Sequence, residues 1–162
     1  MSIILVDDNK VNLFVLEKIL KSVNYPEAIF LQSAHELYDY LHIFDQAASA
    51  QSVDLILLDI MMPEIDGIEA CKKIRQDDRY KNTQIIFTTA LDDKKKLAEA
   101  LAAGGNDYVT KPINRTELIA RIDVALRLKK ELDWHAQHEK NIEAELKLAT
   151  QVQRSLLSKP VE

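Results

Sequence analysis

The sequence has little cysteine, no long apolar run and no excess of basic residues. Its single cysteine, Cys71, excludes an internal disulfide framework and a cysteine-rich metal site. Cys71 has apolar neighbours in a helical pattern, so we expect a small buried hydrophobe and not a nucleophile. The amino terminus is apolar for only four residues before two aspartates. It is too short for a signal peptide and lacks the basic flank of one.

No apolar run approaches the length of a membrane-spanning helix. The formal net charge of −5 supplies no basic surface for nucleic acid. We therefore expect a cytoplasmic protein with no membrane partner and no nucleic-acid partner. Its 162 residues suit one domain with an appendage, which is long enough to bury a sizeable core.

The most informative run is residues 53–67, an apolar stretch interrupted only by Asp54 and followed by Pro63 and Gly67. This pattern is typical of a strand buried on both faces in the middle of a parallel sheet. Asp59 stands where the strand ends, and open α/β sheets bind ligands outside the carboxyl ends of their strands. Taken alone, Asp59 favours a plainer interpretation, a helix cap or the start of a turn.

Five short apolar runs alternate with segments of helical periodicity. The runs predict strands at residues 3–6, 28–31, 53–58, 84–88 and 107–110. The helical segments follow Asn9, extend from Ser33 to Phe44, cover residues 67–76 and 92–103, and begin again at Asn114. Ser33 and Glu36 have the spacing of a capping box. This order predicts an α/β fold, (βα)5, whose parallel sheet has helices on both faces.

Every predicted strand except the second ends in polar side chains, and parallel strands end at one edge of a sheet. Asp7 and Asp8 follow the first strand, Asp59 the third, Thr89 the fourth and Lys111 the fifth. Adjacent carboxylates repel each other and favour a bound cation. Magnesium prefers one or two carboxylates, several waters and a phosphate oxygen. An aspartate can also accept a phosphoryl group, a reaction that a metal, a lysine and a hydroxyl assist.

These residues belong to a set of motifs that resembles the receiver domain of two-component response regulators. The resemblance covers about residues 2–127, with five motifs in the family's order and spacing. They are Val6-Asp7-Asp8-Asn9, Leu57-Leu58-Asp59-Ile60-Met61-Met62-Pro63, Asp66-Gly67, Thr89-Ala90 and Tyr108-Val109-Thr110-Lys111-Pro112. The resemblance implies a flavodoxin-like, doubly wound sheet with strand order 2-1-3-4-5.

The resemblance implies that Asp59 accepts phosphate from a histidine kinase or phosphotransfer protein. Asp8 and Asp59 would hold Mg²⁺, with Asp7 acting through water and the backbone carbonyl of Met61 as a further ligand. Lys111 would pair with a phosphoryl oxygen. On this interpretation the receiver is not an enzyme beyond its own phosphorylation and dephosphorylation.

The switch residues implied by the resemblance are Thr89 and Tyr108. Thr89 would hydrogen-bond the phosphoryl group and move inward, and Tyr108 would follow from an exposed to a buried position. A cis bond is expected before Pro112. Taken one at a time, these residues have plainer interpretations: Lys111 as a surface lysine and Tyr108 as a half-buried strand aromatic. Thr88 is an alternative to Thr89 as the residue that supplies the hydroxyl.

Met61, two residues after Asp59, has no polar group to hold an attacking water. We therefore expect a long-lived phosphoryl group. Two other functions remain open: a phosphate-independent dimeric adaptor that docks through the receiver, and a phosphohydrolase. Phosphohydrolases with an aspartate nucleophile have Asp-x-Asp after the first strand, whereas this chain has Asp7-Asp8-Asn9.

Neither glycine nor proline occurs between Asn114 and Ser158, which predicts a helix roughly 65 Å long. Residues 1–127 would form the receiver, residues 128–158 a helical extension and residues 159–162 a tail. Seam positions spaced alternately by four and three residues are Leu128, Leu132, His135, Glu139, Ile142, Leu146, Ala149, Gln153 and Leu156. The apolar stripe favours a parallel coiled-coil homodimer over a frayed monomeric helix, although three polar seam positions weaken it.

The segment from Glu145 to Pro160 looks like the linker before protein phosphatase 2C-like serine/threonine phosphatase domains of bacterial stress and anti-sigma regulators. This second resemblance covers only about sixteen residues. It predicts that an output domain follows the tail in a longer protein. The alternative is a complete receiver with an oligomerising tail.

Overall fold

The computed structural model describes residues 2–25, 28–90 and 92–157, with side chains described as far as residue 151. The chain divides into two units, residues 1–129 and residues 130–162. The predicted tail, residues 159–162, lies outside the described residues. Among the described helices, none combines the length and the apolarity needed to cross a lipid bilayer.

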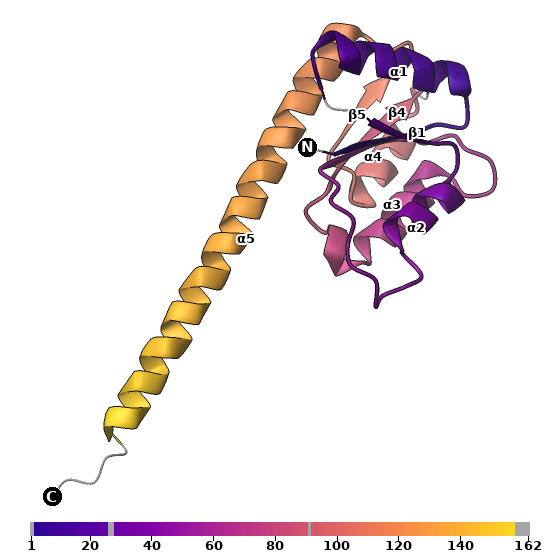
Figure 1. Cartoon of the computed structure of the whole chain (residues 1–162). Coiled ribbons are helices and arrows are strands. Elements are labelled where there is room, and N and C mark those ends of the chain that lie inside the picture. The colour runs from indigo at the N-terminus through magenta and orange to yellow at the C-terminus, as the bar shows by residue number, and fades with distance from the viewer. Residues whose placement is uncertain (1, 26–27, 91, 158–162) are drawn as a thin grey trace, which may run out of the picture. The chain divides into compact units, whose positions relative to one another are not determined.

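Five parallel strands form one sheet in the first unit, in the order β2-β1-β3-β4-β5. Figure 1 shows α1 on one side of this sheet and α2 and α3 on the other. The strands are β1 (Ile3–Val6), β2 (Ala28–Leu31), β3 (Leu55–Asp59), β4 (Gln84–Thr89) and β5 (Asp107–Thr110). The (βα)5 fold and its strand order are as predicted. β1, β3 and β4 are buried along their whole length, which explains why their sequences are continuously apolar instead of alternating.

Helices cover both faces of this sheet. They are α1 (Lys10–Ser22), α2 (Ala34–Leu41), α3 (Gly67–Arg75), α4 (Lys94–Ala102) and α5 (Arg115–Leu157). One apolar core lies between the sheet and α1 with the first turns of α5, and the other lies between the sheet and α2, α3 and α4. Cys71 is free and fully buried in the second core, as expected, and burial raises the pKa of its thiol to about 11.

Several elements differ from the prediction, most of them by one or two residues at an end. β3 begins at Leu55 and includes Asp59, whereas the predicted strand covered residues 53–58. α2 ends at Leu41 and not at Phe44, because His42 adopts the left-handed conformation, with φ 55°. A short 3-10 helix, η1 (Asp78–Tyr80), was not predicted.

The Ser33 cap of α2 is present, since its hydroxyl accepts a hydrogen bond from the Glu36 N–H at 3.1 Å. The Glu36 carboxylate, however, bonds the N–H of Gln32 and not that of Ser33. The second hydrogen bond of the capping box is therefore made to the residue before the N-cap, and not to the N-cap itself.

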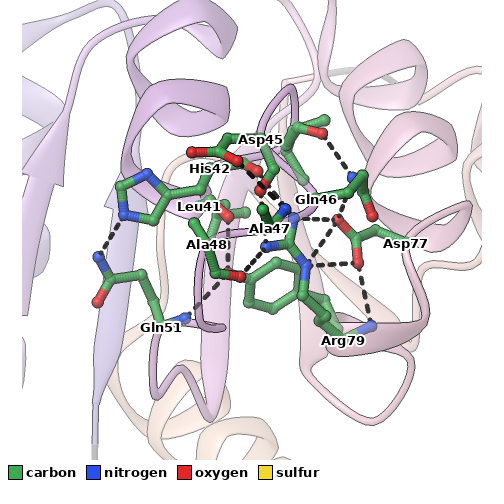
Figure 2. Close-up of polar contacts among 11 residues, drawn as sticks. Leu41, His42, Asp45, Gln46, Ala47, Ala48, Gln51, Asp77 and Arg79 are labelled. Carbon is green, nitrogen blue, oxygen red and sulfur yellow. Dashed lines mark hydrogen bonds and ion pairs between the residues drawn. The ribbon is translucent and has the colours of Figure 1, made fainter.

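A polar network around Arg79 holds the connection between α2 and β3 (Figure 2). The Arg79 guanidinium donates to the carbonyls of His42, Asp45 and Ala48 at 2.8, 3.2 and 2.9 Å. It also pairs with the carboxylate of Asp77 at 2.6 Å, and this holds the pKa of Asp77 down at about 2. One side chain thus anchors a loop more than thirty residues away in the sequence.

In the second unit, residues 130–151 are helical and mostly exposed. They form part of α5, a single helix from Arg115 to Leu157, so the long C-terminal helix is confirmed. Its exposed apolar side chains include Trp134, Ile142, Leu146 and Leu148. The Trp134 ring stacks on His138 with 4.9 Å between ring centroids. The coiled coil itself stays a prediction.

Candidate functional site

The site lies at the edge of the sheet where β1 and β3 end. The backbone N–H of Asp7 continues the ladder to the carbonyl of Leu31 at 3.1 Å, so Asp7 is held in place one residue beyond β1. Asp7 is fully buried, whereas Asp8 is exposed. Asp59 is the last residue of β3 and is only 3% exposed. Two buried carboxylates therefore lie beside one that faces solvent.

Asp7, Asp8 and Asp59 each place one carboxylate oxygen within 4.8 Å of the others. Three hard oxygen donors at this separation match the ligand preference of Mg²⁺, which binds carboxylates and retains waters. The sequence predicted this grouping from the strand ends alone. The donor set therefore fits a divalent cation.

Lys111 brings the opposite charge to the same place. Its Nζ lies 3.0 Å from Oδ2 of Asp7 and 3.3 Å from Oδ1 of Asp59. The backbone N–H of Lys111 donates to the Thr89 carbonyl at 2.7 Å, which fixes the start of the loop after β5. The peptide bond between Lys111 and Pro112 is cis, as expected. The interpretation of Lys111 as an unattached surface lysine is wrong.

The pKa of Asp59 is raised to about 6. Burial is the main cause, because it disfavours the charged form, and the neighbouring Asp7 carboxylate adds to it. Lys111 and the Met61 backbone N–H act in the opposite direction. An aspartate in this environment binds a proton, a cation or another electrophile more readily than an exposed one does.

The loop after Asp59 is shaped by close backbone contacts. The Met61 N–H donates to Oδ1 of Asp59 at 3.3 Å, and the Gly67 N–H donates to the Ile60 carbonyl at 2.8 Å. A Cβ on Gly67 would lie 2.2 Å from the Asp59 carbonyl oxygen, so only glycine fits. Asp66 caps α3 by accepting from the Glu69 N–H at 2.9 Å. Asp59 therefore makes a turn contact but is not the helix cap.

Met61 is 58% exposed beside this loop. Its side chain lines an open hollow together with Asp8, Glu64 and Lys96, among others. Lys96 belongs to α4, so the hollow spans the ends of β1, β3 and the start of α4. The Met61 side chain is therefore accessible to solvent beside Asp59.

The two threonines that end β4 occupy alternating positions in the strand. Thr88 pairs with Asp59 in the sheet register, and Thr89 pairs with Thr110. Because strand side chains alternate between faces, Thr88 shares a face with Asp59 and Thr89 lies on the other. Both are buried. Thr88 also lines a pocket with Asp7 and Lys111.

Thr88 was considered only as a substitute for Thr89 in the sequence. The alternation of side chains along a strand would have placed Thr88 on the Asp59 face if the strand register were known. The sequence does not reveal that register, because both faces of β4 are buried and its residues do not alternate between apolar and polar. Tyr108 is half-buried and packs against the core on the side of α2, α3 and α4. The switch roles of Thr89 and Tyr108 stay predictions.

The comparisons with known proteins identify the family. The sequence model of the response regulator receiver domain family matches residues 3–123. The chain belongs to this family. This receiver is 37% identical over 126 residues to the transcriptional regulatory protein SpaR of Bacillus subtilis, covering 77% of the chain and 51% of SpaR. It is 35% identical to the nisin biosynthesis regulatory protein NisR of Lactococcus lactis subsp. lactis, covering 84% and 54%.

Solved receiver structures resemble this receiver closely. The receiver domain of the sensor histidine kinase PA1611 from Pseudomonas aeruginosa PAO1 has a TM-score of 0.64 and 31% identity, covering 80% of this chain and 97% of that one. That structure contains a magnesium ion coordinated in the active site cleft. A two-component response regulator from Clostridium difficile has a TM-score of 0.67 and 28% identity, covering 78% and 96%.

The chain spans about half the length of the curated relatives named here, 51% of SpaR and 54% of NisR. The shared region is the receiver. The functions of the remaining halves of those relatives are therefore not carried by the aligned residues.

Proposed function

We propose that Asp59 is phosphorylated by a histidine kinase or a phosphotransfer protein in the presence of Mg²⁺. One observation carries the proposal. Carboxylate oxygens of Asp7, Asp8 and Asp59 lie within 4.8 Å of one another, and the Lys111 Nζ lies 3.3 Å from Oδ1 of Asp59. A phospho-acceptor needs a nucleophilic carboxylate beside groups that neutralise phosphoryl oxygens. Asp59 is such a carboxylate, and its neighbours are such groups.

Asp7, Asp8, Asp59 and the Met61 backbone carbonyl would hold the magnesium ion. When bound, Mg²⁺ supplies positive charge for the phosphoryl oxygens. The magnesium in the PA1611 receiver, 31% identical to this chain, supports this assignment. The three carboxylates also repel one another without a cation, so ion binding relieves a cost built into the fold.

Asp59 attacks in its ionised form. A carboxylate oxygen forms the new O–P bond while the N–P bond of the donor phosphohistidine breaks, and the freed imidazole nitrogen takes a proton. Lys111, already 3.3 Å from Asp59, moves only a short way to pair with a phosphoryl oxygen. Its contact with Asp7 at 3.0 Å orients the ammonium group beforehand.

The switch that follows would use Thr89 and Tyr108. Thr89 is the last residue of β4, and its carbonyl accepts a hydrogen bond from the Lys111 N–H. A shift of either residue would therefore move the other. Tyr108, half-buried in β5, is placed to change its packing when the end of β4 moves. The proposed readout is the face formed by α4, β5 and α5.

We further propose that α5 carries the signal as a parallel homodimer to an output domain. Exposed Ile142 and Leu146 on the described part of the helix support a partner, because an apolar stripe in water favours association. The linker resemblance of residues 145–160 supports a phosphatase 2C-like output, although side chains from residue 152 onward lie outside the described residues.

SpaR is named as a transcriptional regulatory protein and NisR as a biosynthesis regulatory protein, and the aligned region covers only about half of each. For that reason the expectation of no nucleic-acid partner is not extended to a longer protein. If coding sequence continues past Glu162, it would distinguish a phosphatase 2C-like output domain from one that binds nucleic acid.

Intact-mass spectrometry with acetyl phosphate and Mg²⁺ tests the central proposal. The parent protein should gain one phosphoryl group, and Asp59→Asn should gain none. A parent that stays unmodified, or a variant that gains equally, overturns the proposal. Continuous release of phosphate from an ester would instead favour a phosphohydrolase. Beryllofluoride that leaves both dimer mass and Trp134 fluorescence unchanged would favour the phosphate-independent adaptor.

A further inference from the structure

The hydroxyl of Thr88 is buried without a hydrogen-bond partner. Thr88 is 1% exposed, and among the described side chains its Oγ1 is the buried oxygen or nitrogen atom left unsatisfied. Burying a hydroxyl with no partner is unfavourable, and most buried polar groups in proteins are bonded to protein, water or ligand. A valine of nearly the same shape would avoid the cost. The hydroxyl at this position therefore points to an occupant that satisfies it.

Thr88 lines a pocket on the face of the sheet covered by α1 and the first turns of α5. The pocket has a volume of ≈ 170 Å³. Its polar lining is formed by Thr88, Asp7, Lys111 and the amide of Asn12. Its apolar lining is formed by Val15, Leu16, Pro112 and Ile113. Leu16 is buried, whereas Val15 is 43% exposed, so the lining reaches the protein surface at Val15. The pocket is thus a built space with a polar end and apolar walls.

The volume limits the size of the occupant. An apolar cavity of about 150 Å³ is known to take a benzene molecule. A compact body of roughly six to eight heavy atoms therefore fills this pocket. Larger cofactors and nucleotides are too big for it.

The charges around the pocket limit the chemistry of the occupant. Asp7 and Lys111 are the two charged residues in the lining, and they form an ion pair at 3.0 Å, so the lining itself has no net charge to offer an ionic ligand. An ammonium group has three N–H donors, and the contacts of Lys111 with Asp7 and Asp59 use two. A neutral hydroxyl can accept from the third while it bonds Thr88.

We propose that this pocket binds a small neutral molecule with one hydroxyl group on a compact apolar body. The hydroxyl bonds Thr88, and the apolar body contacts Leu16 and Ile113. The pocket shares Asp7 and Lys111 with the proposed phosphorylation site, but its other lining residues differ from those of the solvent-facing hollow beside Met61 and Asp8. Binding of the neutral molecule needs neither magnesium nor a phosphoryl group, so it can be tested without phosphorylation.

Phenol and toluene make a matched pair of probes, because they have nearly the same size and only phenol carries a hydroxyl. Binding is measured on the full chain in EDTA, without phosphodonor, from the NMR shifts of the Leu16 and Ile113 methyl groups. Phenol should shift both methyls in a saturable way and bind at least as tightly as toluene. A purely apolar pocket would instead prefer toluene, since phenol loses more hydration.

Two variants locate the hydroxyl contact. Thr88→Val should weaken phenol binding about tenfold, the loss expected for one buried hydrogen bond, and leave toluene unchanged. Thr88→Ser keeps a hydroxyl and should bind phenol nearly as the parent does. If Thr88→Val does not fold, the phenol-to-toluene ratio in the parent decides the question.

Three results overturn the proposal. The first is the absence of methyl shifts with either probe, which would leave ordered water as the partner of Thr88. The second is a clear preference of the parent for toluene. The third is an equal loss of phenol and toluene binding in Thr88→Val, which would indicate a packing defect and not a lost hydrogen bond.

Discussion

The Nζ atom of Lys111 lies 3.3 Å from Oδ1 of Asp59, across a sheet edge where Asp7 also approaches Asp59. The ammonium group offsets only part of the cost of burying two carboxylates. The pKa of Asp59 therefore stays high, at about 6, chiefly because of burial. Asp59 is held in a state that is unfavourable for the fold and favourable for binding a cation.

Replacing Asp59 by asparagine should stabilise the metal-free protein at neutral pH. The folded-state pKa is raised from 3.8 to about 6, so the parent loses stability as pH rises through this window. The variant has no such loss. Its advantage should be near zero below pH 4 and reach about 1–2 kcal/mol above pH 7, after allowing for solvent screening at the sheet edge. Urea unfolding in EDTA at several pH values measures it.

The exposed Asp8 provides the matched control for that prediction. Asp8→Asn removes a carboxylate from the same cluster, but one that remains hydrated. It should change the free energy of unfolding much less than Asp59→Asn does. A pH-independent advantage of Asp59→Asn would show that packing, and not ionisation, is responsible.

Met61→Asn should shorten the lifetime of the phosphoryl group. Met61 is 58% exposed beside Asp59 and has no group that can hold a water. An asparagine amide can bond an attacking water, and one hydrogen bond of about 1 kcal/mol corresponds to about a fivefold faster hydrolysis. Loss of the phosphoryl mass after removal of the donor gives the rate. Met61→Leu should behave as the parent, and equal rates in all three proteins would contradict the idea.

Gly67→Ala should destabilise the receiver even though alanine is the better helix former. The added Cβ would lie 2.2 Å from the Asp59 carbonyl oxygen, so the backbone of the loop after β3 has to move. We expect a loss of about 1–3 kcal/mol in the free energy of unfolding, together with slower phosphorylation. Chemical denaturation measures the first effect. A gain of stability, as in an open helix, would show that the loop yields easily.

The sequence predicted the strands and the site because both depend on local patterns. A continuously apolar run marks a buried parallel strand, and parallel strands bring Asp7, Asp59 and Lys111 to one edge. Those steps require no knowledge of packing. The strand boundaries shifted only at β3 and β4, by one or two residues.

The features that could not be predicted from the sequence depend on contacts between residues far apart in the chain. α2 stops at Leu41 where the carbonyl of the next residue, His42, is bound by Arg79, thirty-seven positions later. No local pattern encodes that bond. The position of Thr88 beside Asp59 could not be predicted for a related reason, because the strand register that pairs the two residues is known only from the structure.

The seam of α5 makes a prediction with an internal control. Leu146 is a seam position of the proposed coiled coil and Leu148 is not, yet their exposures are nearly equal at 62% and 64%. Leu146→Lys should therefore lower the molar mass in light scattering from dimer toward monomer, and Leu148→Lys should leave it unchanged. If both substitutions or neither alter the mass, the register is wrong. A parent that is monomeric at all concentrations rules out the dimer.

Arg79→Ala should loosen the connection between α2 and β3 and lower the melting temperature. The guanidinium holds three carbonyls of that loop, and its removal leaves Asp77, only 5% exposed, without its main partner (Figure 2). Amide hydrogen exchange should speed up over residues 42–51, while β3 and β4 keep their protection. Arg121→Ala is the control, because its pair with Asp107 is far more exposed and contributes little.

The pH dependence separates the ion pair from the loop contacts. Arg79 lowers the pKa of Asp77 from 3.8 to about 2, so the pair stabilises the parent above pH 4 and this contribution is lost as pH falls toward 2. The difference in melting temperature between parent and Arg79→Ala should shrink over that window. The carbonyl contacts do not titrate, and they should leave a residual difference at the lowest pH. A difference that is constant from pH 5 to pH 2 would assign the whole effect to those carbonyls and none to Asp77.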